Sequence, residues 1–492
     1  MIDTTIETLG QLKASGYVSK STKQELRDNL IKKLKNKETV FEGVLGFEDT
    51  VIPDMERAML SKHNILLLGL RGQAKTRLAR LMVNLLDEYI PVVEGSELND
   101  DPLNPLSRYA KDLIAIHGDN TPIQWMHRSE RYVEKLATPD VSVADLIGDL
   151  DPIKAATKKL DYSDERVIHF GLIPRAHRCI FVINELPDLQ ARIQVSLFNI
   201  LQEGDIQIRG FKLRLALDIQ FVFTANPEDY TNRGSIITPL KDRIESQILT
   251  HYPRTLEIAK QITHQEAKLS AEQQEQVESS DLVKNLLERI AFQARNSEYV
   301  DEKSGVSARL TIAGYENLVS TAERRMLHNA EDKTAIRVTD FWGVVPAITG
   351  KVELVYEGEQ EGPYGVALRL LNGAIKEEFL ESFPNPDRLK HENDKDPYAV
   401  IAAWFSAGNT ITLLNDATNA QYKYQLSEVS GLMELVQEQG ISDTEQWLYM
   451  ELVLHALAQF ELISREVVNG KVLFQDPLAD ALDELDFGFD DE

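Results

Sequence analysis

Short apolar runs alternate with longer amphipathic stretches through the first half of the chain. Three of these runs hold almost no polar residue and are interpreted as buried strands: Ile65–Leu68, residues 179–183 and residues 219–224. Strands that are apolar on both faces and separated by helices are typical of a parallel sheet with helices on both sides. The pattern therefore predicts an α/β domain over about residues 40–253.

The pattern changes after residue 253. Residues 281–294 and 310–327 repeat apolar positions with helical spacing and carry many charges. This spacing predicts a helical domain over residues 254–355. Gly and Pro within residues 357–365 mark its boundary with a smaller C-terminal α+β region.

Residues 442–460 of this C-terminal region are expected to form a helix. The next segment, residues 462–474, has Asn469 and Gly470 at its centre, which is a strong hairpin turn signal. A helix followed by a hairpin is half of the winged-helix pattern, so residues 356–475 are predicted to be winged-helix-like.

The two ends of the chain differ from the rest. Residues 1–39 are predicted to be a helical segment whose mixed charges indicate a solvated face. From Asp476 onward the chain holds eight acidic residues and no basic one. Residues 476–492 are therefore predicted to be a mobile acidic tail.

Length and charge narrow the classes of function. A chain of 492 residues is too long for one compact core. Lys and Arg number 53 against 79 Asp and Glu, a formal net charge of −26. This charge argues against nucleic acid or anionic lipid as the main partner, because binding phosphates needs clustered cations.

Cysteine and histidine usage exclude two kinds of site. The single cysteine, Cys179, allows neither an internal disulfide nor a thiolate metal cluster, and it is expected to be a buried, inert side chain. The ten histidines show no paired-ligand spacing, which argues against a dedicated zinc site. With no signal-peptide pattern and no run near the ~20 apolar residues of a membrane span, we expect a soluble cytoplasmic protein.

The strongest chemical signal directly follows the first strand. It has the spacing of a phosphate-binding loop between a strand and a helix: Gly69, Leu70, Arg71, Gly72, Gln73, Ala74, Lys75 and Thr76. Backbone N–H groups of such a loop point at phosphate oxygens. Lys75 would reach the terminal phosphates, and Thr76 would offer its hydroxyl to Mg²⁺. Ala74 stands where the motif has its last glycine, and a positive φ there would cost about 1 kcal/mol.

The second predicted strand ends in Asn184 and Glu185. An apolar strand that ends in two polar residues is how nucleotide hydrolases place a metal-linked group and a general base beside the phosphates. Glu185 would polarise the attacking water. Asn184 replaces the usual Asp and adds no negative charge, so weaker metal binding is expected.

Three further residues complete the candidate site. Asn226 follows the third strand and would orient the attacking water. Arg243 is a candidate arginine finger from a neighbouring subunit, and Arg309 could reach the terminal phosphate from the helical domain. Taken alone, Asn226 is better explained by a turn before proline, and Arg243 and Arg309 are better explained as surface ion-pair residues.

Five features follow one another along the chain: the phosphate loop, the Asn184–Glu185 pair, Asn226, Arg243 and Arg309. In this order they resemble the AAA+ ATPases of the magnesium chelatase ATPase-subunit and MoxR-type group. The resemblance covers about residues 40–355. It is carried by GLRGQAKTR, HFGLIPRAHRCIFVINELPDL, LFNILQEGDIQIRGFKLRL, FVFTANPEDY and PLKDRI. It implies an AAA+ P-loop NTPase domain with a parallel sheet between helices, followed by a helical lid. Residues 205–215 look like the hairpin that this group carries before its third strand.

The resemblance also implies roles and partners. Lys75 and Thr76 match the phosphate and magnesium positions, Glu185 the catalytic base, and Asn226 the water-orienting residue. Arg243 matches the finger and Arg309 the lid sensor, whereas Ala74 and Asn184 depart from the family pattern. The group implies ATP and Mg²⁺ as cofactors and a homo-oligomeric ring, hexameric by analogy. It implies a partner protein with a von Willebrand A type domain, which the ring would remodel or load with metal.

Some segments lie outside what the resemblance explains. Residues 94–138 look like an enlarged insertion, and residues 141–169 sit where the group has an insertion that touches partners. The region after residue 356 is not covered.

Two other functions are compatible with the same sequence features. One is a nucleotide-binding scaffold with little hydrolysis, because Asn184 and Ala74 depart from the motif. The other is a nucleic-acid-remodelling ATPase that uses a C-terminal winged helix, against which the net charge of −26 argues.

Overall fold

The computed structural model describes residues 4–159, 164–208, 214–226, 235–389, 396–468 and 470–477. The chain divides into two compact units, Met1–His251 and Tyr252–Glu492. Each unit has its own hydrophobic core, and each is described by itself below.

The first unit is built on a five-stranded sheet in the order β11-β1-β10-β7-β4. All four neighbouring pairs are parallel. The strands are β1 (Ile65–Leu68), β4 (Tyr132–Leu136), β7 (Cys179–Asn184), β10 (Ile219–Ala225) and β11 (Ser246–Leu249). The three apolar runs of the sequence form β1, β7 and β10, so the predicted α/β class with a parallel sheet is confirmed.

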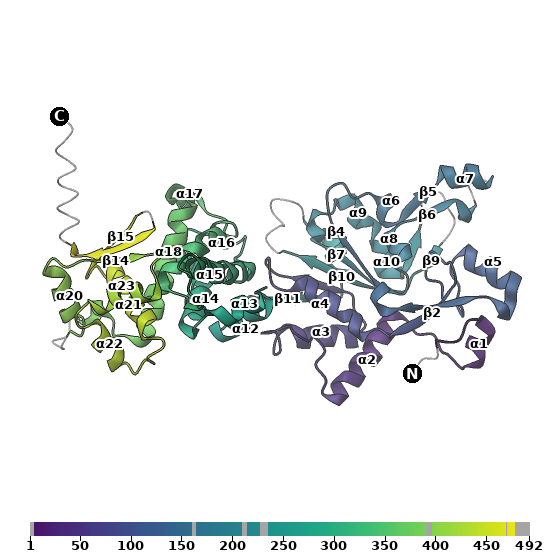
Figure 1. Ribbon diagram of the computed structural model, residues 1–492. Helices are drawn as coiled ribbons and strands as arrows, with labels where there is room; N and C mark the ends of the chain where they lie inside the picture. The colour runs from purple at the N-terminus through teal and green to yellow at the C-terminus, as the bar shows by residue number, and fades with distance from the viewer. Residues whose placement is uncertain are drawn as a thin grey trace. The chain divides into compact units, whose positions relative to one another are not determined.

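Helices cover both faces of this sheet (Figure 1). Successive strand residues belong to different cores: Ile65 and Leu67 pack with α2, α3 and α4, whereas Leu66 and Leu68 pack into the opposite cluster. The helices of the unit are α1 (Leu9–Ala14), α2 (Thr22–Asn36), α3 (Val51–Leu60), α4 (Lys75–Leu81), α5 (Arg108–His117), α6 (Val143–Leu146), α7 (Pro152–Lys158), α8 (Leu172–Arg175), α9 (Ala191–Ser196), α10 (Phe198–Glu203) and α11 (Thr238–Lys241). Two-sided cover explains why the central strands are mostly apolar.

One sequence interpretation needs correction here. The sequence predicts an insertion at residues 94–138, but Tyr132–Leu136 within them form β4, the edge strand of the central sheet. An edge strand is half-exposed and alternates polar with apolar residues, so β4 lacks the apolar run by which β1, β7 and β10 are recognised. Only the part of the segment before β4 lies outside the sheet.

The N-terminal segment is helical, but it is not simply solvated. Helix α2 buries Leu26 and Leu30 in the core beside α3. Its Glu25 forms a buried two-pronged pair with Arg131, at 2.7 and 3.0 Å. Because both partners are almost fully buried, the pair fastens α2 to the residue that precedes β4.

Small antiparallel pairs flank the sheet. The segment before β4 pairs β2 (Tyr89–Val93) with β3 (Ile123–His127), and the second insertion pairs β5 (Gly148–Leu150) with β6 (Ile168–Phe170). A hairpin of β8 (Asp205–Gln207) and β9 (Arg214–Ala216) precedes β10, where the resemblance places a hairpin. Its turn lies outside the described residues. Short 3₁₀ turns lie at Met82–Leu85, Gly118–Asn120, Arg128–Glu130, Glu165–Val167 and Leu186–Asp188.

The second unit begins as a helical bundle. Its first elements are α12 (Leu256–Glu266), α13 (Ala271–Gln276), β12 (Val277–Glu278), α14 (Asp281–Asn296), α15 (Arg309–His328), β13 (Thr334–Ala335), a 3₁₀ helix η7 (Val338–Val344) and α16 (Val345–Thr349). Buried leucines on α14 and α15 form the centre of this bundle. The two amphipathic stretches of the sequence thus form its two long helices.

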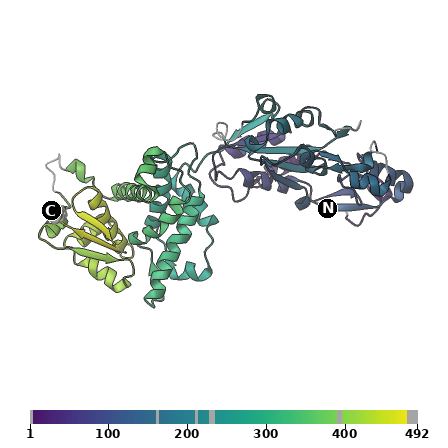
Figure 2. The same cartoon turned by 90° about the horizontal axis from the view of Figure 1, so that it is seen from above.

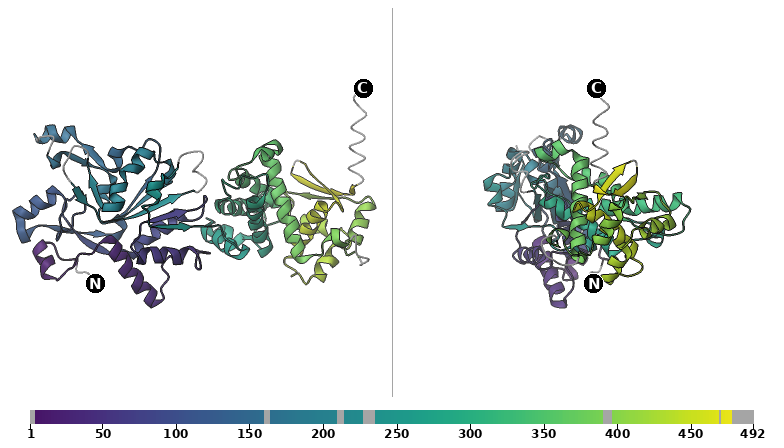
Figure 3. Two further views of the ribbon diagram at one scale, coloured as in Figure 1. Left: turned by 180° about the vertical axis from the view of Figure 1, so that it is seen from behind. Right: turned by 90° about the vertical axis from the view of Figure 1, so that its left-hand side faces the viewer.

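The C-terminal part adds more helices and a three-stranded sheet in the order β14-β16-β15, which can be followed in Figure 2. Its elements are α17 (Tyr356–Glu361), α18 (Pro363–Ser382), α19 (Pro386–Leu389), α20 (Ala399–Ser406), β14 (Ile411–Leu414), α21 (Asn419–Ser427), α22 (Leu432–Glu438), α23 (Gln446–Gln459), β15 (Ser464–Val468) and β16 (Lys471–Gln475). The hairpin β15–β16 is antiparallel, and β14 pairs with β16. Helix α18 runs between the bundle and α23 (Figure 3), and one continuous core extends from residue 277 to residue 474.

Most of the predicted acidic tail, residues 478–492, and Asn469 of the predicted turn lie outside the described residues. Among the helices that the structure does describe, none combines the length and apolar character needed to cross a membrane.

Candidate nucleotide-binding site

The candidate residues of the first unit follow three adjacent strands. The register pairs Leu68 with Ala225 and Phe223 with Ile183, so β1, β10 and β7 end nearly level. Because the strands are parallel, the segments that follow them lie at one edge of the sheet. Neighbouring strands are about 4.8 Å apart, so the ends of β1 and β7 are separated by roughly 10 Å. One nucleotide with its phosphates spans such a distance.

The phosphate loop makes a tight turn directly after β1. A side chain at Gly69 would place its Cβ 1.9 Å from Thr250 Oγ1 and 2.2 Å from Gln73 Oε1. These two groups are themselves hydrogen-bonded, with the Thr250 hydroxyl donating to Gln73 Oε1 at 2.7 Å. A side chain at position 69 would displace the Gln73–Thr250 hydrogen bond, which fixes the loop against the end of β11.

The loop backbone turns left-handed before the helix begins. Gly72 has φ 73° and Ala74 has φ 54°. This conformation is strained for an L-residue such as Ala74, whereas glycine adopts it freely. Ala74 is also the residue before the first turn of α4, where backbone N–H groups have no partner within the helix.

Lys75 is held inside the loop. Its side chain is 8% exposed, and its ammonium donates to the carbonyl of Gly69 and, at 2.9 Å, to the carbonyl of Leu70. Thr76 follows it in the first turn of α4. The loop therefore offers N–H groups, an ammonium and a hydroxyl to one small volume, which is the donor set that binds polyphosphates.

A directed chain of hydrogen bonds joins the ends of β7 and β10. The backbone N–H of Glu185 donates to Thr224 Oγ1 at 3.2 Å, and the Thr224 hydroxyl donates to Asn184 Oδ1 at 3.1 Å. Asn184 and Thr224 are both buried, and Glu185 is in the left-handed region with φ 54°. The backbone at position 185 is thus tied to the neighbouring strand β10.

The chain of hydrogen bonds continues to Glu134, a residue that the sequence analysis does not single out. Asn184 Nδ2 donates to Glu134 Oε1 of β4 at 2.5 Å. The other oxygen of Glu134 accepts from Arg80 of α4, at 2.9 and 3.1 Å, and from the Tyr132 hydroxyl at 3.2 Å. Burial raises the pKa of Tyr132, and the neighbouring Glu134 raises it further, so this hydroxyl remains a donor.

A sequence signal for these two missed residues does exist. Thr224 is one of two polar residues in the buried strand Ile219–Ala225. Glu134 interrupts the segment Tyr132–Leu136 at the position facing the same side as Val182. A polar side chain near the end of a buried strand needs a hydrogen-bond partner. Without the register of β4 against β7, however, the partner could not be named.

The remaining candidate residues are placed as follows. Asn226 is 2% exposed and directly follows β10. The guanidinium of Arg243 donates to the Pro239 carbonyl at 2.7 Å and lies 4.7 Å from the centre of the Phe198 ring. Arg309 begins α15 in the second unit and is exposed, so its reach to the phosphates stays a prediction.

The donor set fits a magnesium ion that arrives with a nucleotide. Within the described ranges, no group of three or more His, Cys, Asp and Glu side chains could hold a metal ion. Thr76 and Asn184 offer hard oxygen donors instead. Mg²⁺ is commonly bound by one or two protein ligands together with substrate phosphates and waters, which matches this arrangement.

The lone cysteine lies at the opposite end of β7. Cys179 is 1% exposed, and burial raises the pKa of its thiol to about 12. Such a thiol is almost never ionised near neutral pH, in agreement with the expected inert role.

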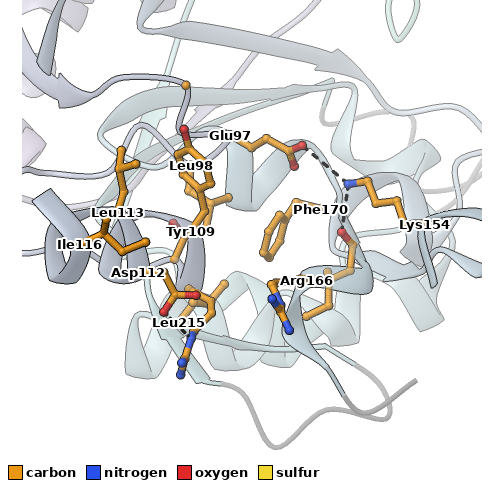
Figure 4. Close-up of a pocket in the computed structure, with 14 residues that line it drawn as sticks. Glu97, Leu98, Tyr109, Asp112, Leu113, Ile116, Lys154, Arg166, Phe170 and Leu215 are labelled. Carbon is orange, nitrogen blue, oxygen red and sulfur yellow. Dashed lines mark hydrogen bonds and ion pairs between the residues drawn. The ribbon is translucent and has the colours of Figure 1, made fainter. Parts of the chain in front are cut away.

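A hollow lies near this end of the sheet, bounded by both insertions (Figure 4). It has a volume of about 430 Å³. Tyr109 and Leu113 of α5 line it opposite Phe170 of β6, and the Lys154–Glu97 ion pair (3.6 Å) lies on its rim. Next to the wall, Asn99 donates to the carbonyl of His177, just before β7 begins. The hollow is therefore at the edge of the sheet opposite the phosphate loop.

Comparison with known proteins gives loose structural likenesses. No family model matches the sequence. A candidate ATPase from Cytophaga hutchinsonii is 16% identical with a TM-score of 0.29, covering 74% of this chain and 98% of that one. The complex of BchI and BchD of magnesium chelatase gives 19% identity and a TM-score of 0.34, covering 65% and 98%. A variant of RuvB from Thermotoga maritima gives 11% and 0.31, covering 94% and 93%.

The first unit defines its own fold class. A parallel sheet lies between helices, a phosphate loop joins its central strand β1 to α4, and polar residues end the neighbouring strands β10 and β7. A helical region follows it in the chain. The first unit therefore has an α/β fold with a phosphate-loop element after a central strand, which is the fold class that the resemblance to the AAA+ ATPases implies.

Proposed function

We propose that the protein binds Mg-ATP at the carboxyl edge of the central sheet and hydrolyses it. The observation that carries this proposal is the convergence of the phosphate loop, Glu185 and Asn226 after three adjacent parallel strands. Ligands of open α/β sheets bind outside the carboxyl ends of the strands, which is where these residues lie.

Each residue has a role that follows from its chemistry. The loop N–H groups hold phosphate oxygens, and Lys75 exchanges its contacts with the Gly69 and Leu70 carbonyls for the terminal phosphates. Bound Mg²⁺ neutralises part of the phosphate charge. Glu185 accepts a proton from the attacking water, which Asn226 orients through its amide.

For the assembly, we propose a homo-oligomeric ring of the hexameric kind, as in the group that the sequence resembles. In such a ring Arg243 would stabilise the transition-state charge on the neighbouring subunit's ATP. Arg309 would act from the helical lid.

We propose that the ring remodels, or loads metal into, a partner protein with a von Willebrand A type domain. The hollow between the insertions supports a partner contact on the first unit, because its exposed Tyr109 and Ile116 are apolar groups on a rim of charges. Its position at the edge away from the phosphate loop would leave it open while nucleotide is bound.

A nucleotide-binding scaffold is the second candidate, and Asn184 is the observation that favours it. The side chain at this position is neutral, and its nitrogen already donates to Glu134. Without a carboxylate at residue 184, metal binding would be weaker and hydrolysis slower. Steady-state phosphate release separates an ATPase from a scaffold.

Titration calorimetry with ATP and Mg²⁺ tests the site. Lys75→Ala is expected to abolish measurable ATP binding, because it removes the ammonium that the loop holds where the terminal phosphates would lie. Lys35→Ala removes an exposed lysine of α2 and is the matched control, for which affinity should not change. Normal affinity in Lys75→Ala would refute the assignment of the phosphate loop.

A further inference from the structure

The residue at the candidate metal position, Asn184, carries an amide, and an amide can turn either its oxygen or its nitrogen toward a cation. Its oxygen attracts Mg²⁺, whereas its –NH₂ group repels it. The orientation of the Asn184 side chain therefore decides whether residue 184 helps or hinders metal binding. The side chain is 8% exposed, so solvent contributes little to that choice.

The hydrogen bonds around Asn184 determine its orientation from both sides. On one side, the N–H of Glu185 can only donate, so Thr224 Oγ1 accepts from it and uses its own proton to reach Asn184 Oδ1 at 3.1 Å. On the other side, the Glu134 carboxylate can only accept, so Asn184 turns its Nδ2 toward it and donates to Oε1 at 2.5 Å. The hydrogen-bond partners on both sides of Asn184 therefore require the same orientation of its amide.

The strand order shows where the oxygen faces. Glu134 lies on β4 and Thr224 on β10, on opposite sides of β7, and β10 is the neighbour of β1. The amide nitrogen therefore points to the sheet edge, and the oxygen points toward the strand that carries the phosphate loop. Val182, two residues before Asn184, packs on the face that α4 covers, and Glu134 pairs with it in register.

Glu134 is itself held in place. Its Oε2 accepts from Arg80 and from Tyr132, and its Oε1 accepts from Asn184. The side chain is 24% exposed. Both oxygens are occupied, so Glu134 is placed to orient Asn184 rather than to bind the metal.

We propose that Glu134 is a positioning residue of the nucleotide site, which fixes the amide of Asn184 with its oxygen toward Mg²⁺. Glu134 thereby places a carboxylate on β4, one strand away from residue 184, where the related motif has an Asp. This inference rests on the proposed function, since it concerns how that site holds its metal.

The test measures ADP binding by calorimetry with Mg²⁺ and with EDTA, and it takes the ratio of the two dissociation constants. In the wild type, Mg²⁺ is expected to tighten binding. Glu134→Gln keeps the shape but can present an amide to Asn184, so the ratio is expected to fall about tenfold or more. Affinity in EDTA should stay within about twofold, because the loop contacts are unchanged.

A second variant restores the charge at a different position. Asn184→Asp alone would bring two carboxylates into contact, but in Glu134→Gln/Asn184→Asp the new amide can donate to the new carboxylate. The double variant should recover at least the wild-type ratio. Glu88→Gln, which neutralises an exposed carboxylate of the same unit, is the control and should leave the ratio unchanged.

The outcomes separate this inference from the function on which it rests. If Glu134→Gln keeps the wild-type ratio, or loses affinity equally with Mg²⁺ and with EDTA, the positioning role is wrong while the nucleotide site stands. If the double variant does not recover the ratio, orientation and charge at residue 184 are not what Glu134 provides. If the wild type binds no ADP at all, the proposed function falls and this inference falls with it.

Discussion

At the scale of single residues, the phosphate loop combines one position where a side chain would displace a hydrogen bond with one that tolerates alanine under strain. Gly69 is enclosed by Thr250 and Gln73. Ala74, in contrast, is strained by its backbone, with φ 54° and ψ 15°. The sequence indicates that alanine here is unfavourable if φ is positive, and the structure confirms the positive φ.

Ala74→Gly is therefore expected to stabilise the first unit. Removing the Cβ relieves up to about 1 kcal/mol of left-handed strain, from which the greater freedom of glycine in the unfolded chain subtracts part. Urea titration followed by circular dichroism measures the gain. Gly72→Ala, at φ 73°, is the reciprocal variant and should destabilise the unit. A loss of stability in Ala74→Gly would show that the left-handed backbone is not strained.

At the scale of elements, the sequence pattern reveals strands that are buried on both faces, but it does not reveal which strands pair. β1 matches its prediction residue for residue, and β7 and β10 each extend one residue further. All three are buried on both faces. β4 is an edge strand with half-buried residues, and the sequence pattern reveals neither this strand nor the role of its Glu134. Long-range register, which no local pattern encodes, is needed to bring Glu134 to Asn184.

The helices of the second unit enclose an acid that no sequence pattern marks. Glu288 of α14 is 2% exposed. It accepts from the Thr263 hydroxyl of α12 at 2.5 Å, and that hydroxyl is 2.8 Å from the Thr311 hydroxyl of α15. Burial raises the pKa of Glu288 from 4.5 to about 7, against the opposing effect of these hydroxyl donors.

This raised pKa predicts how the stability of the unit depends on pH. The folded state holds the Glu288 proton more tightly than the unfolded state, so the contribution is full below about pH 4.5. It is lost as the pH rises through about 7, a change on the order of 3 kcal/mol. Glu288→Gln should remove this slope, since an amide does not titrate.

Tryptophan fluorescence can isolate the second unit for that measurement. Of the four tryptophans, only Trp125 lies in the first unit, so a Trp125→Phe background reports on Tyr252–Glu492. Urea unfolding between pH 5 and pH 8 would then give the slope. Equal slopes with and without the Glu288→Gln substitution would contradict the raised pKa.

At the scale of the whole molecule, the C-terminal part bears on the choice of function. Helix α23 precedes the hairpin, where a winged helix would present a helix to nucleic acid. Residues 450–457 of α23 are all buried. Glu451 accepts from the N–H groups of Val338 and Thr339 at 2.8 and 2.9 Å, which joins α23 to η7. A helix enclosed in this way offers no face to a groove, in agreement with the net charge of −26.

Only part of this C-terminal region can be predicted from local sequence. Asn469 and Gly470 indicate the hairpin, and β15–β16 is present. Strand β14 lies more than fifty residues away from its partner β16 and pairs across α21, α22 and α23. A short strand that depends on such a distant partner carries little local signal.

Ring assembly is tested by mixing subunits. Arg243→Ala should leave ATP affinity unchanged and lower hydrolysis on the order of a thousandfold, because an arginine finger acts on the transition state. Mixed with Lys75→Ala subunits, part of the activity should return, since each variant supplies what the other lacks. Arg192→Ala, an exposed arginine of α9, is the control. Absence of any rescue would argue against a finger that acts between subunits.

The central claim is that ATP bound at the phosphate loop is hydrolysed by water activated at Glu185. Steady-state phosphate release from Mg-ATP, compared between the wild type and Glu185→Gln, tests it most directly. The wild type should turn over, and the variant should bind ATP normally but release phosphate at least about a hundredfold more slowly. Equal rates in the two proteins would contradict the claim.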